Sequence, residues 1–175
     1  LCDRRQRQMC IRDRTGTGAA VIFGTTGGVM EAALRTVAEV VAGKELPKLE
    51  YNEVRGMEQT REAVIDVAGV SVKVAVVHTL KSAKMMLERI KAGTADYQFI
   101  EVMACPGGCI GGGGQPVPVD ASIRQKRREA IFNCDRTSEL RKSHENPEIK
   151  TLYDTWLGKP LSEKAHSLLH THYHA

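Results

Sequence analysis

The sequence lacks any long hydrophobic run. No segment has about eighteen consecutive uncharged apolar residues, the minimum for a membrane-spanning helix, and no charged-then-apolar leader of the secretory type is present. We therefore expect neither a membrane span nor export, and we expect the protein to be cytoplasmic. The chain has 175 residues and is 42% hydrophobic, which is sufficient for one domain, or one and a small extension, with a real core.

Cysteines are too few and too unevenly placed for a disulfide framework. The chain has five, an odd number, and only Cys105 and Cys109 are closely spaced. In a reducing compartment a close pair more often indicates metal or redox chemistry than a structural bridge. This pair is therefore the first candidate for a chemical site.

A phosphate-binding glycine loop is also missing. The glycines between residues 16 and 28 do not have the G-x-G-x-x-G spacing, and no Gly-Lys-Ser/Thr follows them. Nucleotide binding is therefore not expected.

Basic charge is scarce outside the first fourteen residues. The net charge is +4, but "LCDRRQRQMCIRDR" carries five arginines and two aspartates, which leaves +1 for the rest. A nucleic-acid-binding surface is therefore not supported. Residues 1–14 show no apolar period and stop at a glycine-rich "TGTG", so we interpret them as a non-native leader. The alternative is a native, disordered basic arm.

Periodicity predicts alternating helices and strands as far as Pro118. The expected elements are a helix over 29–43, a strand over 48–56, a hairpin over 61–79 turning at Ala68-Gly69, a helix over 80–93 and a strand over 97–104. Met85 and Met86 are expected to fill the core. This order indicates an α/β fold with a partly parallel sheet, whose sites lie at the carboxyl ends of strands.

Beyond Pro118 the pattern is entirely helical. Three short helices are expected, over 122–135, 146–158 and 162–173, with Asn146 and Ser162 as N-caps. Cys134 is interpreted as a small buried side chain. A helical appendage packed on the α/β unit is the resulting expectation.

Two polar groups in this region carry weaker signals. The basic run 126–128 is interpreted as a solvated face rather than a docking site for an acidic electron donor. His166, His170, His172 and His174 could bind a metal ion, but a solvated helix end is favoured because no carboxylate or cysteine accompanies them.

The pair Cys105 and Cys109 encloses Pro-Gly-Gly. Thiolates select zinc, copper(I) or iron–sulfur clusters, and the additional cysteine and histidine spacing that zinc requires is absent. The spacing alone leaves three possibilities: an iron–sulfur cluster, a redox or catalytic thiol, and buried cysteines without a ligand.

The sequence around the two cysteines favours one of these three possibilities. "EVMACPGGCIGGGGQP" closely resembles the third signature motif of iron-only hydrogenases, and "IFGTTGGVMEAALR" resembles the segment that precedes it. "RKSHENPEIKTLYDTWLGKPLSEKAHSLLHTHY" is similar to their helical small-subunit region, which in some members is a separate chain. The resemblance covers residues 15–174 in family order. It implies that 15–118 form the C-terminal part of one lobe of the catalytic domain, a mixed sheet flanked by helices, and that 119–175 form a helical extension.

The resemblance also implies a cofactor and a set of site residues. The cofactor is the H-cluster, a 4Fe-4S cluster joined to a diiron subcluster with CO, CN and dithiolate ligands. By resemblance, Cys105 ligates the cubane and Cys109 bridges it to the diiron unit. The residues that would surround the diiron unit are Met103 on one side and Phe23, Gly24, Thr25, Thr26 and Val29 on the other. Cys109 and Met103 would thus serve reversible dihydrogen oxidation and proton reduction.

The departures from the family pattern are equally informative. Two earlier cysteine signatures, the proton-relay cysteine, the cyanide-holding lysine and the electron-feeding domains do not occur. The resemblance therefore implies a fragment that supplies two of four cluster ligands and is inactive alone. Its implied partners are the missing N-terminal portion of the subunit, ferredoxin or NAD(P)-reducing subunits, and hydrogenase maturation factors.

Two alternatives remain open. Hydrogenase-like cytosolic iron–sulfur assembly or scaffold proteins keep a similar "ACPGGC" loop without a diiron unit. "FGTTGGVMEAALR" and the absence of a terminal tryptophan after Tyr173 favour the enzyme. The other alternative, a small-subunit-type structural module, is disfavoured by the long segment before Gly107.

Overall fold

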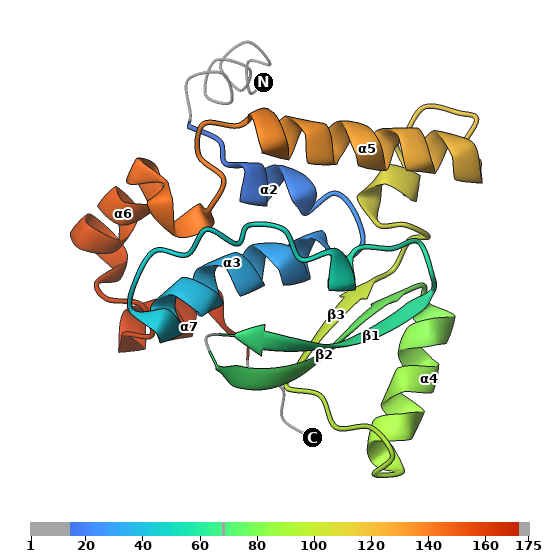
Figure 1. Cartoon of the computed structure of the whole chain (residues 1–175), viewed down its shortest axis with the longest axis horizontal. Coiled ribbons are helices and arrows are strands. Elements are labelled where there is room, and N and C mark those ends of the chain that lie inside the picture. The colour runs from blue at the N-terminus through green and yellow to red at the C-terminus, as the bar shows by residue number, and fades with distance from the viewer. Residues whose placement is uncertain (1–14, 68, 172–175) are drawn as a thin grey trace.

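The computed structural model describes residues 15–67 and 69–171, and Figure 1 shows their arrangement. The sheet has three strands, β1 (Thr60–Val67), β2 (Val70–His78) and β3 (Phe99–Met103), in the order β1-β2-β3. β1 pairs with β2 antiparallel, and β2 pairs with β3 parallel. His78 lies opposite Met103, so the carboxyl ends of β2 and β3 meet at one edge of the sheet.

Helices account for most of the remaining structure. The α-helices are α2 (Gly18–Ile22), α3 (Gly28–Ala42), α4 (Leu80–Lys91), α5 (Ala121–Thr137), α6 (Pro147–Leu152) and α7 (Glu163–Leu169). Short 3-10 helices are η1 (Asn52–Val54), η2 (Cys109–Gly111) and η3 (Ser143–Glu145), and η4 (Tyr153–Leu157) is π-helical. No helix in the described part of the chain is long and apolar enough to cross a membrane.

The elements form a stack of layers, visible in Figure 1 as α5, α2, α3, the sheet and α4 from top to bottom. Met30 and Leu34 of α3 pack on Val74 and Val76 of β2. The other face of β2 packs against α4. Because β2 is covered on both faces, it is almost continuously apolar, as expected for a central strand.

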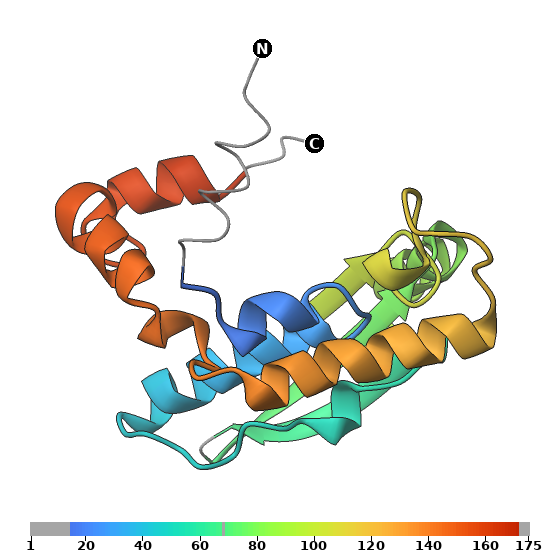
Figure 2. The same cartoon turned by 90° about the horizontal axis from the view of Figure 1, so that it is seen from above.

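The C-terminal helices lie beside this stack. In Figure 2, α6 and α7 extend away from the layers on the side opposite the 104–118 segment. Asn146 accepts a hydrogen bond from the Glu148 N–H group, and Ser162 accepts one from the Ala165 N–H group. These are the N-caps that the sequence predicted.

A buried ion network joins α3 to α5. The Arg35 guanidinium donates to both carboxylate oxygens of Asp135, at 2.7 and 2.8 Å, and to Glu31 at 2.7 Å. All three side chains are fully buried. Removing one partner of such a network would leave an uncompensated charge in the interior, so substitution of any of the three residues should be strongly destabilising.

The fold class predicted from the sequence is confirmed: the chain is α/β with a mixed sheet flanked by helices. The helix that ends at Gly43, the hairpin, the helix after Thr79 and the strand before Cys105 all form where the sequence predicted. The three C-terminal helices are present as well.

Three local predictions are wrong. The predicted strand over 48–56 is irregular chain around η1, because its buried residues Tyr51 and Val54 are three positions apart and pack on α3. Cys134 is exposed rather than buried, on the outer side of α5. Met86 fills the core, but Met85 is 57% exposed because adjacent residues on a helix point about 100° apart.

Candidate metal centre at the cysteine loop

The two close cysteines lie on residues 104–112, called the cysteine loop here. The loop follows β3 directly, and Cys109 begins η2. Cys105 is half-buried and Cys109 is exposed. The loop therefore lies at the carboxyl end of a parallel strand, the position where the fold class predicts a site.

Backbone hydrogen bonds hold the cysteine loop against the turn between α2 and α3. The Thr26 N–H group donates to the Gly107 carbonyl at 3.0 Å, and the Ile110 N–H group donates to the Gly24 carbonyl at 3.1 Å. The structure thus places the two most distinctive segments of the sequence in direct contact.

Gly108 lies where the loop approaches Met103 and the Thr25-Thr26 turn closely. Its φ is +92°, and a Cβ atom there would lie 2.8 Å from the Met103 Sδ atom and 2.9 Å from the Thr26 backbone nitrogen. A side chain is therefore excluded both by backbone conformation and by space. The Met103 sulfur consequently lies at the contact between the loop and the Thr25-Thr26 segment.

The candidate residues are not equally close to the loop. Gly24 and Thr26 bind it directly, and Thr25 is buried beside Gly108 with no hydrogen-bond partner for its hydroxyl. Phe23 is 46% exposed, and Val29 is half-buried in the first turn of α3. Phe23 and Val29 thus flank the contact rather than form it.

Glu101 supports the site but was not predicted. Its carboxylate is buried and accepts hydrogen bonds from the Gly27 and Met30 N–H groups, each at 2.7 Å. Burial raises the pKa of Glu101, and these N–H donors oppose that rise. β3 thereby caps the N-terminus of α3 and fixes the turn on which the cysteine loop rests. In the sequence, this role could have been suspected from the single acidic residue within the apolar segment "FIEVMA".

His78 was also missed. Its Nδ1 atom lies 3.3 Å from both the Gly107 nitrogen and the Thr26 hydroxyl. Because a backbone N–H group can only donate, Nδ1 acts as the acceptor and carries no proton. Burial, together with the charge of Arg124, lowers the pKa of His78. A neutral imidazole therefore connects the end of β2 to the cysteine loop.

Helix α5 holds the other side of the loop. The Arg127 guanidinium donates to the Ile110 carbonyl at 2.9 Å and to the Pro116 carbonyl at 2.7 Å. The prediction of a solvated basic face over 126–128 therefore holds for the exposed Lys126 and is wrong for the half-buried Arg127 and Arg128. His166 and His170 lie on α7 or at its end, with ring centroids 4.5 Å apart, whereas His172 and His174 lie outside the described residues.

The donor set fits part of an iron–sulfur site. Cys105 and Cys109 offer soft thiolate ligands on a loop whose Gly108 allows close backbone approach. Cys134 is the remaining cysteine of the described residues, and it lies seven residues beyond Arg127 on α5, about 10 Å along the helix. These residues therefore suit one side of a cluster whose other ligands come from elsewhere.

Comparison with known families agrees with this site. Residues 5–113 match the family described as "Iron only hydrogenase large subunit, C-terminal domain", and residues 121–175 match "Iron hydrogenase small subunit". Together these matches cover nearly the whole chain. The chain therefore belongs to the iron-only hydrogenase family.

Individual relatives give the same result. The NADP-reducing hydrogenase subunit HndD of Solidesulfovibrio fructosivorans is 51% identical over 158 residues, which are 90% of this chain and 27% of the relative. A solved structure of a variant of FeFe-hydrogenase HydA1 from Chlamydomonas reinhardtii is 46% identical, with a TM-score of 0.67 over 86% of this chain and 45% of that one.

A relative whose name gives a different role has a lower sequence identity to this chain. Cytosolic iron-sulfur assembly component 3 of Rattus norvegicus is 32% identical over 155 residues, which are 87% of this chain and 32% of the relative. The chain thus spans about a quarter to a third of the length of these curated relatives.

Proposed function

We propose that this chain forms one side of the H-cluster site of an iron-only hydrogenase and supplies two of its four cysteine ligands. One observation carries the proposal: the cysteine loop is hydrogen-bonded to the Thr25-Thr26 turn, with the Met103 sulfur at the contact. The family to which the chain belongs supports the same assignment.

Each residue has a distinct role in this proposal. Cys105 holds the 4Fe-4S cluster, and the Cys109 thiolate joins it to the diiron subcluster with its CO, CN and dithiolate ligands. When bound, the H-cluster supplies the iron chemistry of reversible dihydrogen oxidation and proton reduction. Met103 packs at the pocket next to Cys109, and the glycines of the loop let backbone N–H groups approach.

The wall opposite the cysteines comes from the turn between α2 and α3. Thr25 and Thr26 are buried, and Gly24 accepts a hydrogen bond from the loop, so this part of the wall is fixed and excludes water. Phe23 and Val29 extend the wall at its edges. The exposed side of Cys109 is the side on which further protein would complete the site.

The proposal requires partners. The other two cluster ligands would come from an N-terminal portion of the same subunit, and electrons from ferredoxin or NAD(P)-reducing subunits in the cytoplasm. Maturation factors would insert the diiron subcluster. In this view 15–118 belong to the large-subunit domain and 119–175 to the small-subunit-like region. The HndD relative, a subunit of an NADP-reducing hydrogenase that is much longer than this chain, supports this arrangement.

A second candidate function is cytosolic iron–sulfur assembly without a diiron unit. The similarity to cytosolic iron-sulfur assembly component 3 of Rattus norvegicus favours it, although the identity to HndD is higher. The two functions differ in whether CO and CN ligands are present.

Infrared spectroscopy on the complete subunit separates the two functions. The subunit would be produced together with hydrogenase maturation factors and purified without oxygen. We expect CO and CN stretching bands together with dihydrogen evolution from a reduced electron donor. A protein with a stoichiometric 4Fe-4S cluster but neither bands nor activity would contradict the hydrogenase proposal and support the assembly function.

A further inference from the structure

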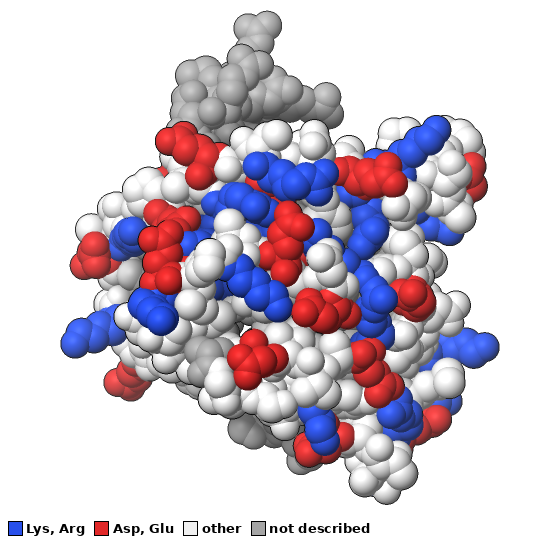
Figure 3. Space-filling model, in the orientation of Figure 1, with Lys and Arg blue, Asp and Glu red and all other residues white. Residues whose placement is uncertain are grey.

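A cavity whose lining includes no residue of the cysteine loop carries a concentration of cationic side chains. It lies between α5 and the segment of chain that includes η1, and its volume is about 340 Å³. Its lining contains four arginines and one carboxylate: Asn52, Arg55, Arg61, Arg128, Glu129, Phe132 and Arg136. In Figure 3 the face between α5 and the hairpin shows Lys and Arg atoms with acidic atoms among them.

The helix geometry explains why α5 contributes so much of this lining. Arg128, Phe132 and Arg136 are spaced four residues apart, so they share one face of the helix. Two guanidinium groups lie over the Phe132 ring, with the carbon of Arg55 4.2 Å and that of Arg128 5.2 Å from the ring centroid. The aromatic ring therefore forms an apolar wall that holds the guanidinium planes in place.

The charges within the cavity are incompletely balanced. Arg55 is neutralised by Glu31, at 2.6 and 2.7 Å. Arg61 lies 3.7 Å from the carboxylate of the exposed Glu58, its one acidic partner within the described residues. Arg128 and Arg136 have no carboxylate within 4.0 Å among the residues that the structure describes.

Of the four arginines that line the cavity, Arg128 has the least complete set of hydrogen bonds for its buried donors. Its Nε atom is buried and has no hydrogen-bond acceptor in the structure. Burial and the charges of Arg55 and Arg61 lower its pKa, which shows that the site disfavours the cation as it stands. The carboxylate of Glu129, which lines the same cavity, accepts a hydrogen bond from Gln125 instead. A buried guanidinium with an unused donor is stabilised by an anion that can accept from it.

We propose that this cavity binds a phosphate group, held by Arg128 and Arg136 with Arg61 at its rim. Guanidinium forks match the oxygens of phosphate in geometry and charge. The volume exceeds what a bare phosphate ion needs, so the group can be inorganic phosphate or the phosphoryl end of a larger molecule. The site uses none of the residues assigned to the H-cluster, so a test of phosphate binding does not depend on the proposed function.

Phosphorus NMR on the full 175-residue chain tests the proposal. Inorganic phosphate would be titrated at constant ionic strength maintained with sodium chloride, and thermal unfolding would be followed in parallel. We expect saturable 1:1 binding and a rise in the unfolding midpoint that chloride does not reproduce. Arg128→Gln and Arg136→Gln should each weaken binding at least tenfold.

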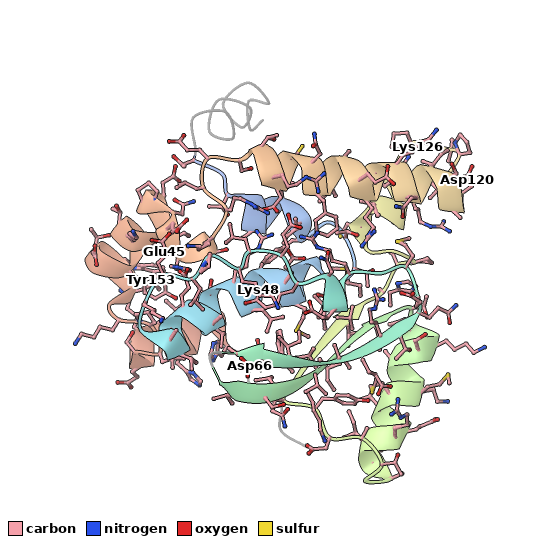
Figure 4. The ribbon with its side chains drawn as sticks, in the orientation of Figure 1. Glu45, Lys48, Asp66, Asp120, Lys126 and Tyr153 are labelled. Atoms are coloured by element: carbon pink, nitrogen blue, oxygen red, sulfur yellow. The ribbon has the colours of Figure 1, made fainter. Side chains whose placement is uncertain are left out.

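Lys126→Gln is the matched control. Lys126 lies two residues before Arg128 on the same helix, is exposed and does not line the cavity, and Figure 4 places it near the outer end of α5. Its substitution removes one positive charge from the same region and should leave binding unchanged. Equal weakening in Lys126→Gln and Arg128→Gln, or equal effects of chloride and phosphate, would overturn the proposal.

The stability of Arg128→Gln without phosphate supplies an independent readout. Because Arg128 is a partly buried cation without an acidic partner, we expect the variant to be at least as stable as the wild type in chloride. If Arg128→Gln does not fold, the exposed Arg136→Gln still decides the outcome. Glycerol phosphate in place of inorganic phosphate identifies the source: comparable affinity indicates a phosphoryl end of a larger ligand, and loss of affinity indicates the free ion.

Discussion

Cys105 and Cys109 are four residues apart on one loop but differ in their surroundings. Cys105 is half-buried against Gly112, whereas Cys109 opens η2 and is exposed. This difference suits the two proposed roles, an anchored ligand of the cubane and a thiolate that faces the diiron unit.

Serine substitution in the complete subunit should separate these roles. Cys109→Ser is expected to abolish the CO and CN infrared bands, because the thiolate that joins the two units is lost. Cys105→Ser is expected first to lower the iron content of the cubane. Iron analysis and infrared spectra measure the two effects, with Cys134→Ser as an unaffected control. Equal loss of both centres in both variants would show that the assignment of roles is wrong.

In the loop between β3 and α5, Gly108 combines a positive φ with a close approach to the Met103 sulfur and the Thr26 backbone. Gly108→Ala places a Cβ against the Met103 sulfur and the Thr26 backbone and forces a positive φ on alanine. We expect a loss of unfolding free energy of about 1–3 kcal/mol, measured by urea denaturation. Gly113→Ala is the control, because nothing lies within 4 Å of the added Cβ and its φ is not positive. Similar losses in both variants would contradict the close packing described here.

The junction of α3 with the C-terminal helices depends on an ionised Glu39. This carboxylate accepts from the Leu46 N–H group, from Lys142 and from His144. The Leu46 N–H group, followed by Lys142, lowers the pKa of Glu39 from 4.5 to about 2. Glu39 therefore holds its proton more weakly in the folded protein than in the unfolded chain.

Stability should consequently depend on pH in the acid range. The ionised Glu39 stabilises the fold above pH 4.5, and this contribution is lost as the pH falls from about 4.5 towards about 2. Unfolding free energies of the wild type should fall over this window more steeply than those of Glu39→Gln. Glu88→Gln, on an exposed position of α4, should follow the wild type. If the unfolding free energy of Glu39→Gln depended on pH as steeply as that of the wild type, Glu39 would not be the source of this pH dependence.

Most elements were predictable because their signals are local. Gly43 ends α3, Gly69 lies between β1 and β2, and an apolar strand leads directly to Cys105. The roles of Glu101 and His78 were not predictable, because Glu101 binds groups 71 and 74 residues away and His78 meets Thr26 52 residues away. Spacing along the chain carries no information about such contacts. The resemblance to the family, by contrast, predicted that Met103 and Thr26 belong to the same site.

At the scale of the whole molecule, the described cysteines make an incomplete cluster site. Two thiolates on one loop leave a 4Fe-4S cluster open to solvent. We therefore expect the 175-residue chain alone to retain little iron after anaerobic reconstitution and to be inactive. Iron and sulfide analysis after gel filtration measures the retention. A stable stoichiometric 4Fe-4S cluster on this chain alone would contradict the prediction.

The buried contact between Arg35 and Asp135 spans the boundary between the two family regions. The peptide link between those regions passes through the 113–120 segment, whose side chains are largely exposed. Covalent continuity is therefore not the sole link between the two described regions, because Phe132 of α5 also shares a buried apolar cluster with α2 and α3. We accordingly expect the same architecture to form from two polypeptides that are divided within this segment.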